Sequence, residues 1–267
     1  MPMVINSNMN SMTAQRNLAT NQNSLSTSMQ RLSSGLRVNN ASDDAAGLAI
    51  ATRMDSQVRG INVAIRNAND GISLAQTAEG ASATTVDVLQ RMRELAVQAQ
   101  NASNGTTDRA NLDTEYQALS SEITRIADAT KFNGTAIVGS AAGAQVFQIG
   151  ANGGDTLTVT TATITTVAGG LTTAALASTA LAAIDAEIVV QTTARASYGA
   201  SINRLGFAIS NLSISGENQA AAKGRIMDAD FAAETSNLSR AQILQQAGNA
   251  MIAQANQQPQ QVMALLR

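Results

Sequence analysis

Residues 50–75 read IATRMDSQVRGINVAIRNANDGISLA, and their apolar side chains recur every three or four positions. This spacing places them on one face of an α-helix, in the heptad pattern by which helices pack on other helices. The residues of this face are Ile50, Met54, Val58, Ile61, Ile65, Ala68, Ile72 and Ala75, and it continues in Val88, Met92, Leu95 and Ala99. The pattern predicts a helix of up to about 55 residues, roughly 80 Å long at 1.5 Å per residue. Gly80 leaves open a kink or break within it.

The sequence before this helix predicts a turn and a second, earlier helix. Residues 37–47 read RVNNASDDAAG, which favours a new helix from about residue 44 with Ser42 or Asp43 as its N-cap. Asp44 would lie near the positive end of that helix. The N-terminal segment carries a helical stripe of its own, formed by Leu18, Leu25, Met29, Leu32 and Leu36. This stripe is typical of a helix that packs on a partner helix.

After residue 100 the pattern changes twice. NASNGTTD at 101–108 predicts a turn, and a shorter helix with Leu112, Tyr116, Leu119, Ile123 and Ile126 on one face should end before Phe132. The stretch VFQIGANGGDTLTVTTATITT at 146–166 then alternates with period two around a glycine-rich connection, which predicts a β-hairpin. The threonines between 156 and 173 fit two interpretations, solvent-facing strand positions and O-glycosylation acceptors in a surface loop.

Helical spacing returns in the last third of the chain. One face comprises Leu181, Ile184, Ile188, Gln191, Arg195, Tyr198, Ile202, Leu205, Ile209 and Leu212. Gln191 and Arg195 interrupt its apolar stripe, and buried polar positions of this kind can fix the register between helices. Gly216 and Gly224, with the acidic residues that follow them, predict another break. A terminal helix then carries the stripe Leu244, Met251, Ala255, Val262 and Leu266. Ala-rich composition and only 2 Pro complete the expectation of a mainly α protein.

The composition excludes most enzyme mechanisms. With no His and no Cys, the chain lacks the parts of a Ser-His-Asp or Cys-His nucleophile pair, of an imidazole or thiolate metal site and of a disulfide. Two acidic pairs remain, Asp43 with Asp44 and Asp228 with Asp230. Such pairs can bind cations or act as general acid and base, but both precede predicted helices, where capping is the favoured interpretation. We therefore expect no catalysis, no cofactor and no metal.

Charge and hydropathy bear on partners and location. The net charge is −2 and the pI about 5.2, which gives no electrostatic footprint for nucleic acid or anionic lipid. No run of 18 or more apolar residues is present, so we expect no membrane span. The first 17 residues, MPMVINSNMNSMTAQRN, contain no basic region followed by an apolar core, so we expect no cleaved signal peptide.

The terminal segments are not expected to fold alone. An isolated tail cannot bury its apolar stripe, and the free energy from that stripe does not offset the conformational entropy lost on ordering the backbone. We therefore predict that the tails stay disordered until other copies of the chain supply the missing surface.

Several phrases of the sequence, in order, resemble bacterial flagellin, the subunit of the flagellar filament. They are SMQRLSSGLRVNNASDDAAGLAIATRM at 28–54, NANDGISLAQTAEGA at 67–81, LQRMRELAVQAQN at 89–101, TKFNG at 130–134, NRLGFAISNL at 203–212, RIMDADFAAE at 225–234 and ILQQAGNAMIAQANQQPQQVMALLR at 243–267. The resemblance covers about residues 3–150 and 176–267. It implies a short flagellin with a minimal variable region, because flagellins have similar ends and a variable middle.

The resemblance implies an architecture. In flagellins the terminal segments pair as a coiled coil lining the inner tube of the filament, and long antiparallel helices with a β-hairpin form an elongated rod around it. Mapped onto this chain, the parts are an N-terminal assembly helix (1–42), rod helices (43–138), a short variable hairpin region (139–175), a returning rod helix (176–222) and a C-terminal assembly helix (223–267). The expected assembly residues are Leu18, Leu25, Met29, Leu32, Leu36, Leu244, Met251, Val262 and Leu266.

The resemblance also implies partners. These are other copies of the chain in a helical polymer, a filament cap protein, hook-associated junction proteins, an export chaperone and the flagellar type III export apparatus, which places the filament outside the cell. A host flagellin-sensing Toll-like receptor would bind a surface formed by Leu89, Gln90, Arg91, Leu95, Gln98 and Glu115. On a helix Arg91, Leu95 and Gln98 can share one face. Subunit packing is the competing role for the same residues, and we expect it to be their main one.

The alternatives to a filament subunit are a hook–filament junction protein and an enzyme. A hook–filament junction protein shares terminal packing helices with flagellin, but the phrases RMRELAVQ and ILQQAGNAMIAQANQ favour flagellin. An enzyme is disfavoured by the missing histidine and by a middle region too short for an inserted catalytic domain. The sequence therefore predicts a structural subunit that polymerises into the motility filament.

Overall fold

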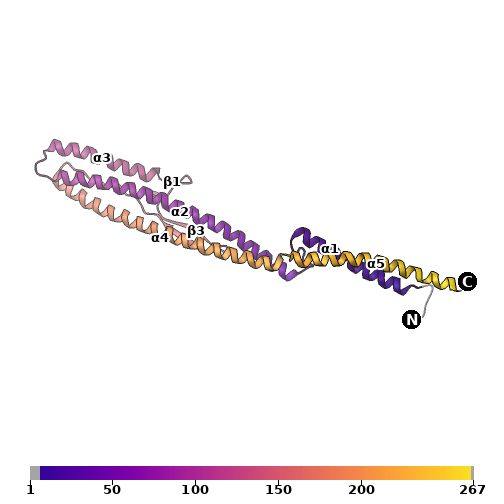
Figure 1. The fold of residues 1–267 in the computed structure, drawn as a ribbon. Helices are drawn as coiled ribbons and strands as arrows, with labels where there is room; N and C mark the ends of the chain where they lie inside the picture. The colour runs from indigo at the N-terminus through magenta and orange to yellow at the C-terminus, as the bar shows by residue number, and fades with distance from the viewer. Residues whose placement is uncertain (1–6, 266–267) are drawn as a thin grey trace. The chain divides into compact units, whose positions relative to one another are not determined.

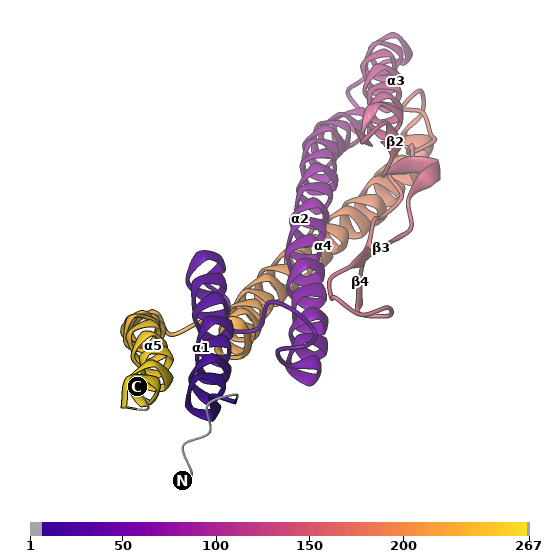
Figure 2. The same cartoon turned by 90° about the vertical axis from the view of Figure 1, so that its right-hand side faces the viewer.

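The computed structural model describes residues 7–265, with side chains described through residue 257. The described chain is mainly α-helical (Figures 1 and 2). Its elements are α1 (Met9–Ser34), α2 (Ala45–Ala99), α3 (Thr106–Ala129), β1 (Lys131–Phe132), β2 (Thr135–Ala136), the 3-10 helix η1 (Gly139–Ala141), β3 (Ala144–Gln148), β4 (Thr156–Thr160), α4 (Ala174–Met227) and α5 (Phe231–Leu265). The prediction of a mainly α protein with a small β region is confirmed.

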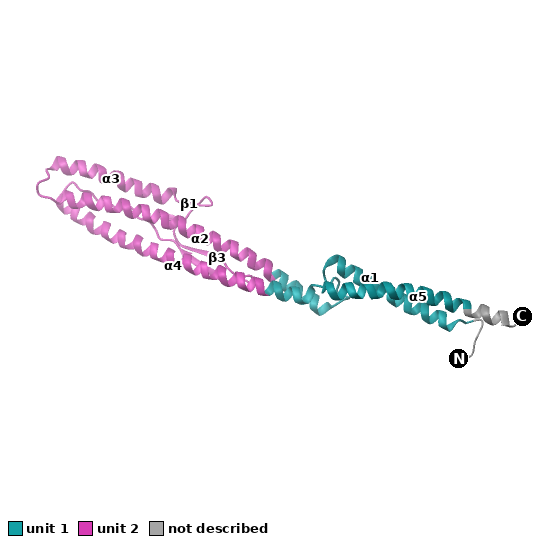
Figure 3. Ribbon diagram, viewed as in Figure 1, with its two compact units in different colours: residues 1–56, 219–267 teal, residues 57–218 magenta. Residues whose placement is uncertain are grey.

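The chain forms two compact units (Figure 3). Unit 1 comprises residues 1–56 and 219–267, and unit 2 comprises residues 57–218. Unit 1 therefore contains α1 and α5, and unit 2 contains α3 and all four strands. The boundaries between the units fall inside the two longest helices, α2 and α4.

The long helices continue past the glycines at which breaks were considered. α2 is one helix through Gly80, and α4 passes Gly216 and Gly224 without interruption. A helical glycine costs only about 1 kcal/mol relative to alanine, which the packing of a long helix can offset. The break follows Met227, and the prediction of an acidic cap there is confirmed, since Asp230 accepts hydrogen bonds from the backbone N–H groups of residues 232 and 233 at 2.9 and 3.2 Å and so caps α5.

The start of α2 is also capped by an acidic residue, but not by the residue expected. Asp44 accepts a hydrogen bond from the backbone N–H of Gly47 at 2.8 Å, which is the N-cap interaction. Asp43 instead accepts from the backbone N–H groups of Asn39 and Asn40 at 3.0 and 2.9 Å and closes the turn before the helix. The expectation of Ser42 or Asp43 as the N-cap is therefore wrong by one residue. All the acids of the two predicted pairs lie at or next to helix ends.

In unit 2, α2 runs antiparallel to both α3 and α4. Arg93 of α2 pairs with Asp185 of α4 at 2.7 Å, and Arg195 pairs with Glu79 at 2.9 Å, so rising residue numbers on one helix meet falling numbers on the other. The turn at residues 100–105 returns the chain as α3. The core between these elements is aliphatic and contains two buried tyrosines; its largest fully buried side chains include Leu89, Met92, Leu95, Tyr116, Ile123, Ile184, Tyr198 and Leu205.

Two small hairpins lie in unit 2. β3 and β4 pair antiparallel, with Val146 opposite Thr158 and Gln148 opposite Thr156, as the period-two pattern predicted. Leu157 and Val159 are buried, and the threonines of β4 are exposed, so these threonines are solvent-facing strand positions. The shorter hairpin of β1 and β2 was not predicted. Its sequence signal is Asn133-Gly134, which both adopt positive φ, of 48° and 79°, as a two-residue primed turn requires.

The polar residues within the α4 stripe have different roles from one another. Gln191 is fully buried, but it donates to Glu187 of the same helix at 2.7 Å and to the carbonyl of Thr163 after β4 at 3.1 Å. Of these two residues, it is Arg195 that links α4 to another helix, through Glu79. Gln191 therefore anchors the segment that follows the hairpin and does not fix the register of two helices.

By length and composition alone, α4 could cross a membrane. Its apolar side chains Ile184 and Leu205 are, however, fully buried in the core of unit 2, beside the buried polar residues Glu187 and Gln191. Buried polar residues that are hydrogen-bonded to neighbouring segments are typical of a helix that packs within a bundle, and we interpret this face of α4 in this way.

Candidate assembly and recognition surfaces

The two terminal helices pair with each other in unit 1. The Nδ2 of Asn8 donates to the carbonyl of Ala255 at 2.7 Å, and the Nδ2 of Asn21 donates to the carbonyl of Ala241 at 2.8 Å. Since the two sequence positions change in opposite directions, α1 and α5 run antiparallel, side by side (Figures 1 and 2). Asparagine side chains at the N-terminal helix therefore hold the two terminal helices together by hydrogen bonds to the backbone of α5.

The seam between α1 and α5 is formed largely by small and polar residues. Ser11 and Ser28 of α1 are buried, as are Glu234 and Ala241 of α5. Gly248 lies against Leu18, because a Cβ placed on this glycine would come 3.2 Å from the Cδ1 of the leucine. Small residues let two helix backbones approach closely, so the seam is narrow.

Backbone hydrogen bonds join the turn that follows α1 to the turn that precedes α5. Gly35 ends α1 with a φ of 72° and donates to the carbonyl of Arg31, the left-handed cap that glycine favours. Its own carbonyl accepts from Ala229 at 2.9 Å, and Arg37 donates to the carbonyl of Met227 at 2.6 Å. The segment after α1 is therefore bonded to the segment before α5.

The structure places the predicted assembly residues in several environments. Leu18, Leu25, Leu32 and Leu36 are half-buried, while Met29, Leu244 and Met251 are exposed by more than half. The side chains of Val262 and Leu266 lie outside the described residues. Leu244 lines a groove between α1 and α5, and Met251 is 62% exposed, whereas Ala241 and Gly248 of α5 lie in the seam with α1. The prediction was based on large apolar residues, and it therefore missed the small and polar residues of this seam.

Large apolar side chains of the two terminal helices are exposed within the described part of the chain. Seven of them, on α1 or α5, are between 52% and 66% exposed: Met9, Met12, Met29, Phe231, Ile243, Leu244 and Met251. Both helices contribute to this set, which we call the terminal apolar face. Single exposed apolar residues are ordinary, but several along one pair of helices make that pair a candidate interaction surface.

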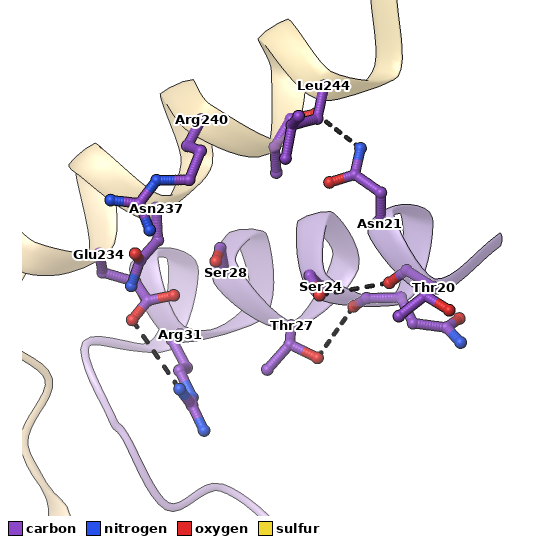
Figure 4. A pocket seen from close by; sticks show the side chains of 12 residues that line it. Thr20, Asn21, Ser24, Thr27, Ser28, Arg31, Glu234, Asn237, Arg240 and Leu244 are labelled. Carbon is purple, nitrogen blue, oxygen red and sulfur yellow. Dashed lines mark hydrogen bonds and ion pairs between the residues drawn. The ribbon is translucent and has the colours of Figure 1, made fainter. Parts of the chain in front are cut away.

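A polar groove of about 510 Å³ lies between α1 and α5 (Figure 4). It is lined by Thr20, Asn21, Asn23, Ser24, Thr27, Ser28, Arg31, Glu234, Asn237, Arg240, Ala241 and Leu244. The Nη1 of Arg31 lies 3.8 Å from a carboxylate oxygen of Glu234. The Nε of Arg31 is buried and donates to no described residue. The groove is thus lined by two arginines and one glutamate, and it contains one hydrogen-bond donor without a partner among the described residues.

A second candidate surface lies on α2 and α3 in unit 2. Arg91 donates to Glu115 through Nε and Nη2 at 2.9 and 2.8 Å, and to Glu94 through Nη1 at 2.9 Å. The hydrogen bonds to Glu115, and then those to Glu94, raise the pKa of Arg91 above its usual value. Glu115 is the residue that links the two helices at this point.

Only some residues of the predicted receptor surface are exposed. Gln90, Arg91, Gln98 and Glu115 are exposed, whereas Leu89 and Leu95 are 0% and 1% exposed and belong to the core of unit 2. The expectation that Leu95 shares an accessible face with Arg91 and Gln98 is therefore not met. Helical spacing of four residues brings side chains near each other, but α3 and the rest of the core cover the side on which Leu95 lies.

Comparison with known proteins gives consistent matches along the chain. The family model for the bacterial flagellin N-terminal helical region matches residues 5–142, and that for the bacterial flagellin C-terminal helical region matches residues 181–266. A flagellin of Halalkalibacterium halodurans is 45% identical over 272 aligned residues, covering 99% of this chain and 100% of the relative. A flagellin of Bacillus subtilis is 42% identical over 306 aligned residues, covering 99% and 100%. The crystal structure of Bacillus cereus flagellin aligns with a TM-score of 0.51 at 34% identity, covering 59% of this chain and 94% of that one.

Proposed function

Because the chain belongs to the bacterial flagellin family, it is a structural subunit that polymerises into the flagellar filament, and we propose that α1 and α5 carry the contacts between copies. It is a structural protein and not an enzyme, and the filament is extracellular. The full-length similarity to flagellins disfavours the alternative of a hook–filament junction protein.

The terminal apolar face is the observation that carries the proposal. Burying one large aliphatic side chain contributes about 1.5 to 3 kcal/mol, so several such residues on one helix pair supply a substantial driving force for association. Contacts between non-equivalent faces of identical subunits do not close on themselves and generate an open helical array. A neighbouring copy is thus the partner that would cover Met29 and Met251, which are 58% and 62% exposed.

The polar groove supports the same proposal. A buried donor without an acceptor costs free energy, and the Nε of Arg31 is in that position within the described part of the chain. A side chain or backbone carbonyl of a neighbouring copy that entered the groove would supply the acceptor. The sequence-based prediction that the tails become ordered only in the polymer belongs to this proposal.

Seeded polymerisation tests the proposal. Ile243→Glu and Met251→Glu each place a charge on the terminal apolar face, and we expect folded monomers that do not extend filament seeds under the electron microscope. Asn111→Glu, at an exposed polar position of α3, is the matched control and should extend seeds. A truncation lacking residues 223–267 should not polymerise at all. Normal filaments from both charged variants would refute the role of this face.

Further partners are proposed on the basis of family membership. We propose export through the flagellar type III apparatus, supported by membership of the flagellin family. An export chaperone, a filament cap protein and hook-associated junction proteins would act before and during assembly. N-terminal sequencing of filament protein checks the export route, since a cleaved leader would remove the first residues.

We propose that the exposed residues Gln90, Arg91, Gln98 and Glu115 contact a host flagellin-sensing Toll-like receptor. The support is the family phrase at 89–98 together with the exposure of these four side chains. Arg91→Ala should weaken binding to the receptor ectodomain. Arg125→Ala, which removes a similar exposed pair with Glu122 on α3, is the control and should bind as the unaltered protein does. Equal binding of both variants would exclude the role of Arg91.

A further inference from the structure

The chain contains three Asn-Gly sequences, at residues 104–105, 133–134 and 152–153. Asn-Gly is chemically reactive because glycine, which lacks a side chain, lets its backbone nitrogen approach the carbonyl carbon of the preceding asparagine side chain. Reaction requires a glycine N–H that is free and an asparagine side chain that can turn toward it. The structure meets these requirements differently at the three positions.

Asn104 is held by two hydrogen bonds at the start of α3. Its Nδ2 donates to the carbonyl of Gln98 at 2.6 Å, which fixes the side chain toward the end of α2. The N–H of Gly105 donates to the carboxylate of Asp108 at 3.0 Å, as in a capping box. Both the attacking nitrogen and the amide under attack are therefore engaged.

Asn133 is held by its backbone conformation. Its φ of 48° and the φ of 79° at Gly134 place both residues in the left-handed region, in which ψ is near +47°. At that ψ the following nitrogen and the asparagine Cβ lie on nearly opposite sides of the Cα–C bond. Ring closure would require this turn, and with it the β1–β2 hairpin, to open.

In the described part of the chain, Asn152 lacks both the side-chain and N–H hydrogen bonds of the first position and the left-handed backbone of the second, although its own carbonyl accepts a hydrogen bond from the Nε2 of Gln148. It lies in the connection between β3 and β4, where residues 151–156 are all exposed. Its φ is not positive, and Gly153 donates no hydrogen bond through its N–H within residues 7–265. The turn is closed around it, by Asp155 donating to the carbonyl of Asn152 at 3.4 Å and by Gly154 with a φ of 98°. The asparagine side chain is free to rotate toward the glycine nitrogen.

We propose that Asn152 is a site of spontaneous deamidation in the folded protein, whereas Asn104 and Asn133 are protected. The nitrogen of Gly153 forms a bond to the Cγ of Asn152, and the bond from Cγ to Nδ2 breaks. The leaving nitrogen takes the proton of the Gly153 N–H and departs as ammonia, which leaves a five-membered succinimide. Water then opens the ring, at Cγ to give aspartate or at the backbone carbonyl carbon to give isoaspartate.

The product changes the hairpin that carries it. It adds a negative charge three residues from Asp155, and the isoaspartate form inserts an additional methylene into the backbone. The adjacent Ala151 lies against α2, since a Cβ built on Gly60 would come 2.9 Å from the Cβ of Ala151. Lengthening the backbone at residue 152 therefore acts on a contact between the hairpin and α2. The modified fraction should rise with the age of the protein.

Hydroxylamine cleavage of the full-length chain tests the proposal, because this reagent cleaves the chain at a succinimide. The native protein should yield fragments 1–152 and 153–267 only, whereas the protein in denaturant should be cut at all three Asn-Gly sequences. Gly153→Ala should abolish the native cleavage. Its Cβ meets no atom within 4 Å and its φ is not positive, so the substitution preserves the fold. Peptide mapping of aged native protein should place isoaspartate at residue 152.

A second variant tests the protection of Asn104. Asp108→Ala frees the N–H of Gly105 but leaves the side chain of Asn104 bonded to the carbonyl of Gln98, so native cleavage after residue 104 should stay below cleavage after residue 152, with circular dichroism checking that the variant is folded. Native cleavage of the unaltered protein at residue 104 or 133 to the same extent as at residue 152 would overturn the proposal. Absence of native cleavage at residue 152 would overturn it as well.

Discussion

Gly248 of α5 faces Leu18 of α1 so closely that a Cβ on the glycine would lie 3.2 Å from the Cδ1 of the leucine. An interior helical glycine is unfavourable by about 1 kcal/mol relative to alanine, so its presence in α5 calls for a packing reason. The approach of Leu18 is that reason. The pair joins the two ends of a 267-residue chain at one contact.

Enlarging Gly248 should separate the terminal helices. Gly248→Ala is expected to be tolerated, because the gain in helix propensity of about 1 kcal/mol offsets a small shift of Leu18. Gly248→Leu should prevent extension of filament seeds, since its side chain needs the space that Leu18 fills. Combining it with Leu18→Ala should restore extension, and a double variant that remains inactive would show that crowding is not the cause.

Replacing Gln191 should destabilise unit 2. Gln191→Leu keeps most of the side-chain volume but removes the hydrogen bonds to the carbonyl of Thr163 and to the carboxylate of Glu187. An unsatisfied buried group costs about 1 to 3 kcal/mol. Chemical denaturation should show a loss in this range. Thr192→Leu, at the adjacent exposed position, is the control and should change stability by less than about 0.5 kcal/mol. An unchanged midpoint for Gln191→Leu would contradict the anchoring role.

Tyr116 should make unit 2 sensitive to alkali. Burial raises the pKa of its phenol above the ordinary value of 10.0, and the charge of Asp113 raises it further. The folded state therefore holds this proton more tightly than the unfolded state, so stability is fully present below pH 10.0 and is lost as pH rises through the raised pKa. Thermal unfolding as a function of pH should show a shallower alkaline decline for Tyr116→Phe. Parallel curves would refute this assignment.

Asp43 should act at the opposite end of the pH scale. The backbone N–H groups of Asn40 and Asn39 hold the pKa of its carboxyl below the ordinary value of 3.8. Its stabilising effect is thus present above pH 3.8 and is lost as pH falls through the lowered pKa. Hydrogen exchange of residues 39 and 40 should accelerate over that acidic range, and Asp43→Asn should show faster exchange already at neutral pH. If the variant exchanges at the unaltered rate, the turn does not depend on the carboxylate.

Most of the secondary structure could be predicted because the chain repeats its local signals many times. The heptad spacing from Ile50 to Ala99 spans many helical turns, so Gly80 could not outweigh it, and α2 is one helix. The alternation around Leu157 and Val159 predicted the hairpin correctly. The similarity of both ends to flagellin identified the family, since so many phrases in one order are specific.

The predictions failed where one residue has two candidate roles. Asp43 and Asp44 are adjacent acids before a helix, and only the direction of the backbone decided that Asp44 caps α2 while Asp43 closes the turn. Gln191 sits in a heptad position, yet its partners are Glu187 and the chain after β4. Sequence spacing contains no information on which neighbouring segment reaches a side chain.

By itself the sequence determined that this is a mainly α flagellin with helices at both ends, because heptad periodicity and helix-ending residues are local properties of the chain. Only the tertiary structure decided which side of each helix is covered. Leu95 is buried and Arg91 exposed, and Gly248 lies in the seam while Met251 faces outward. The physical reason is that periodicity defines a stripe on a helix, whereas burial depends on the partner that packs against it.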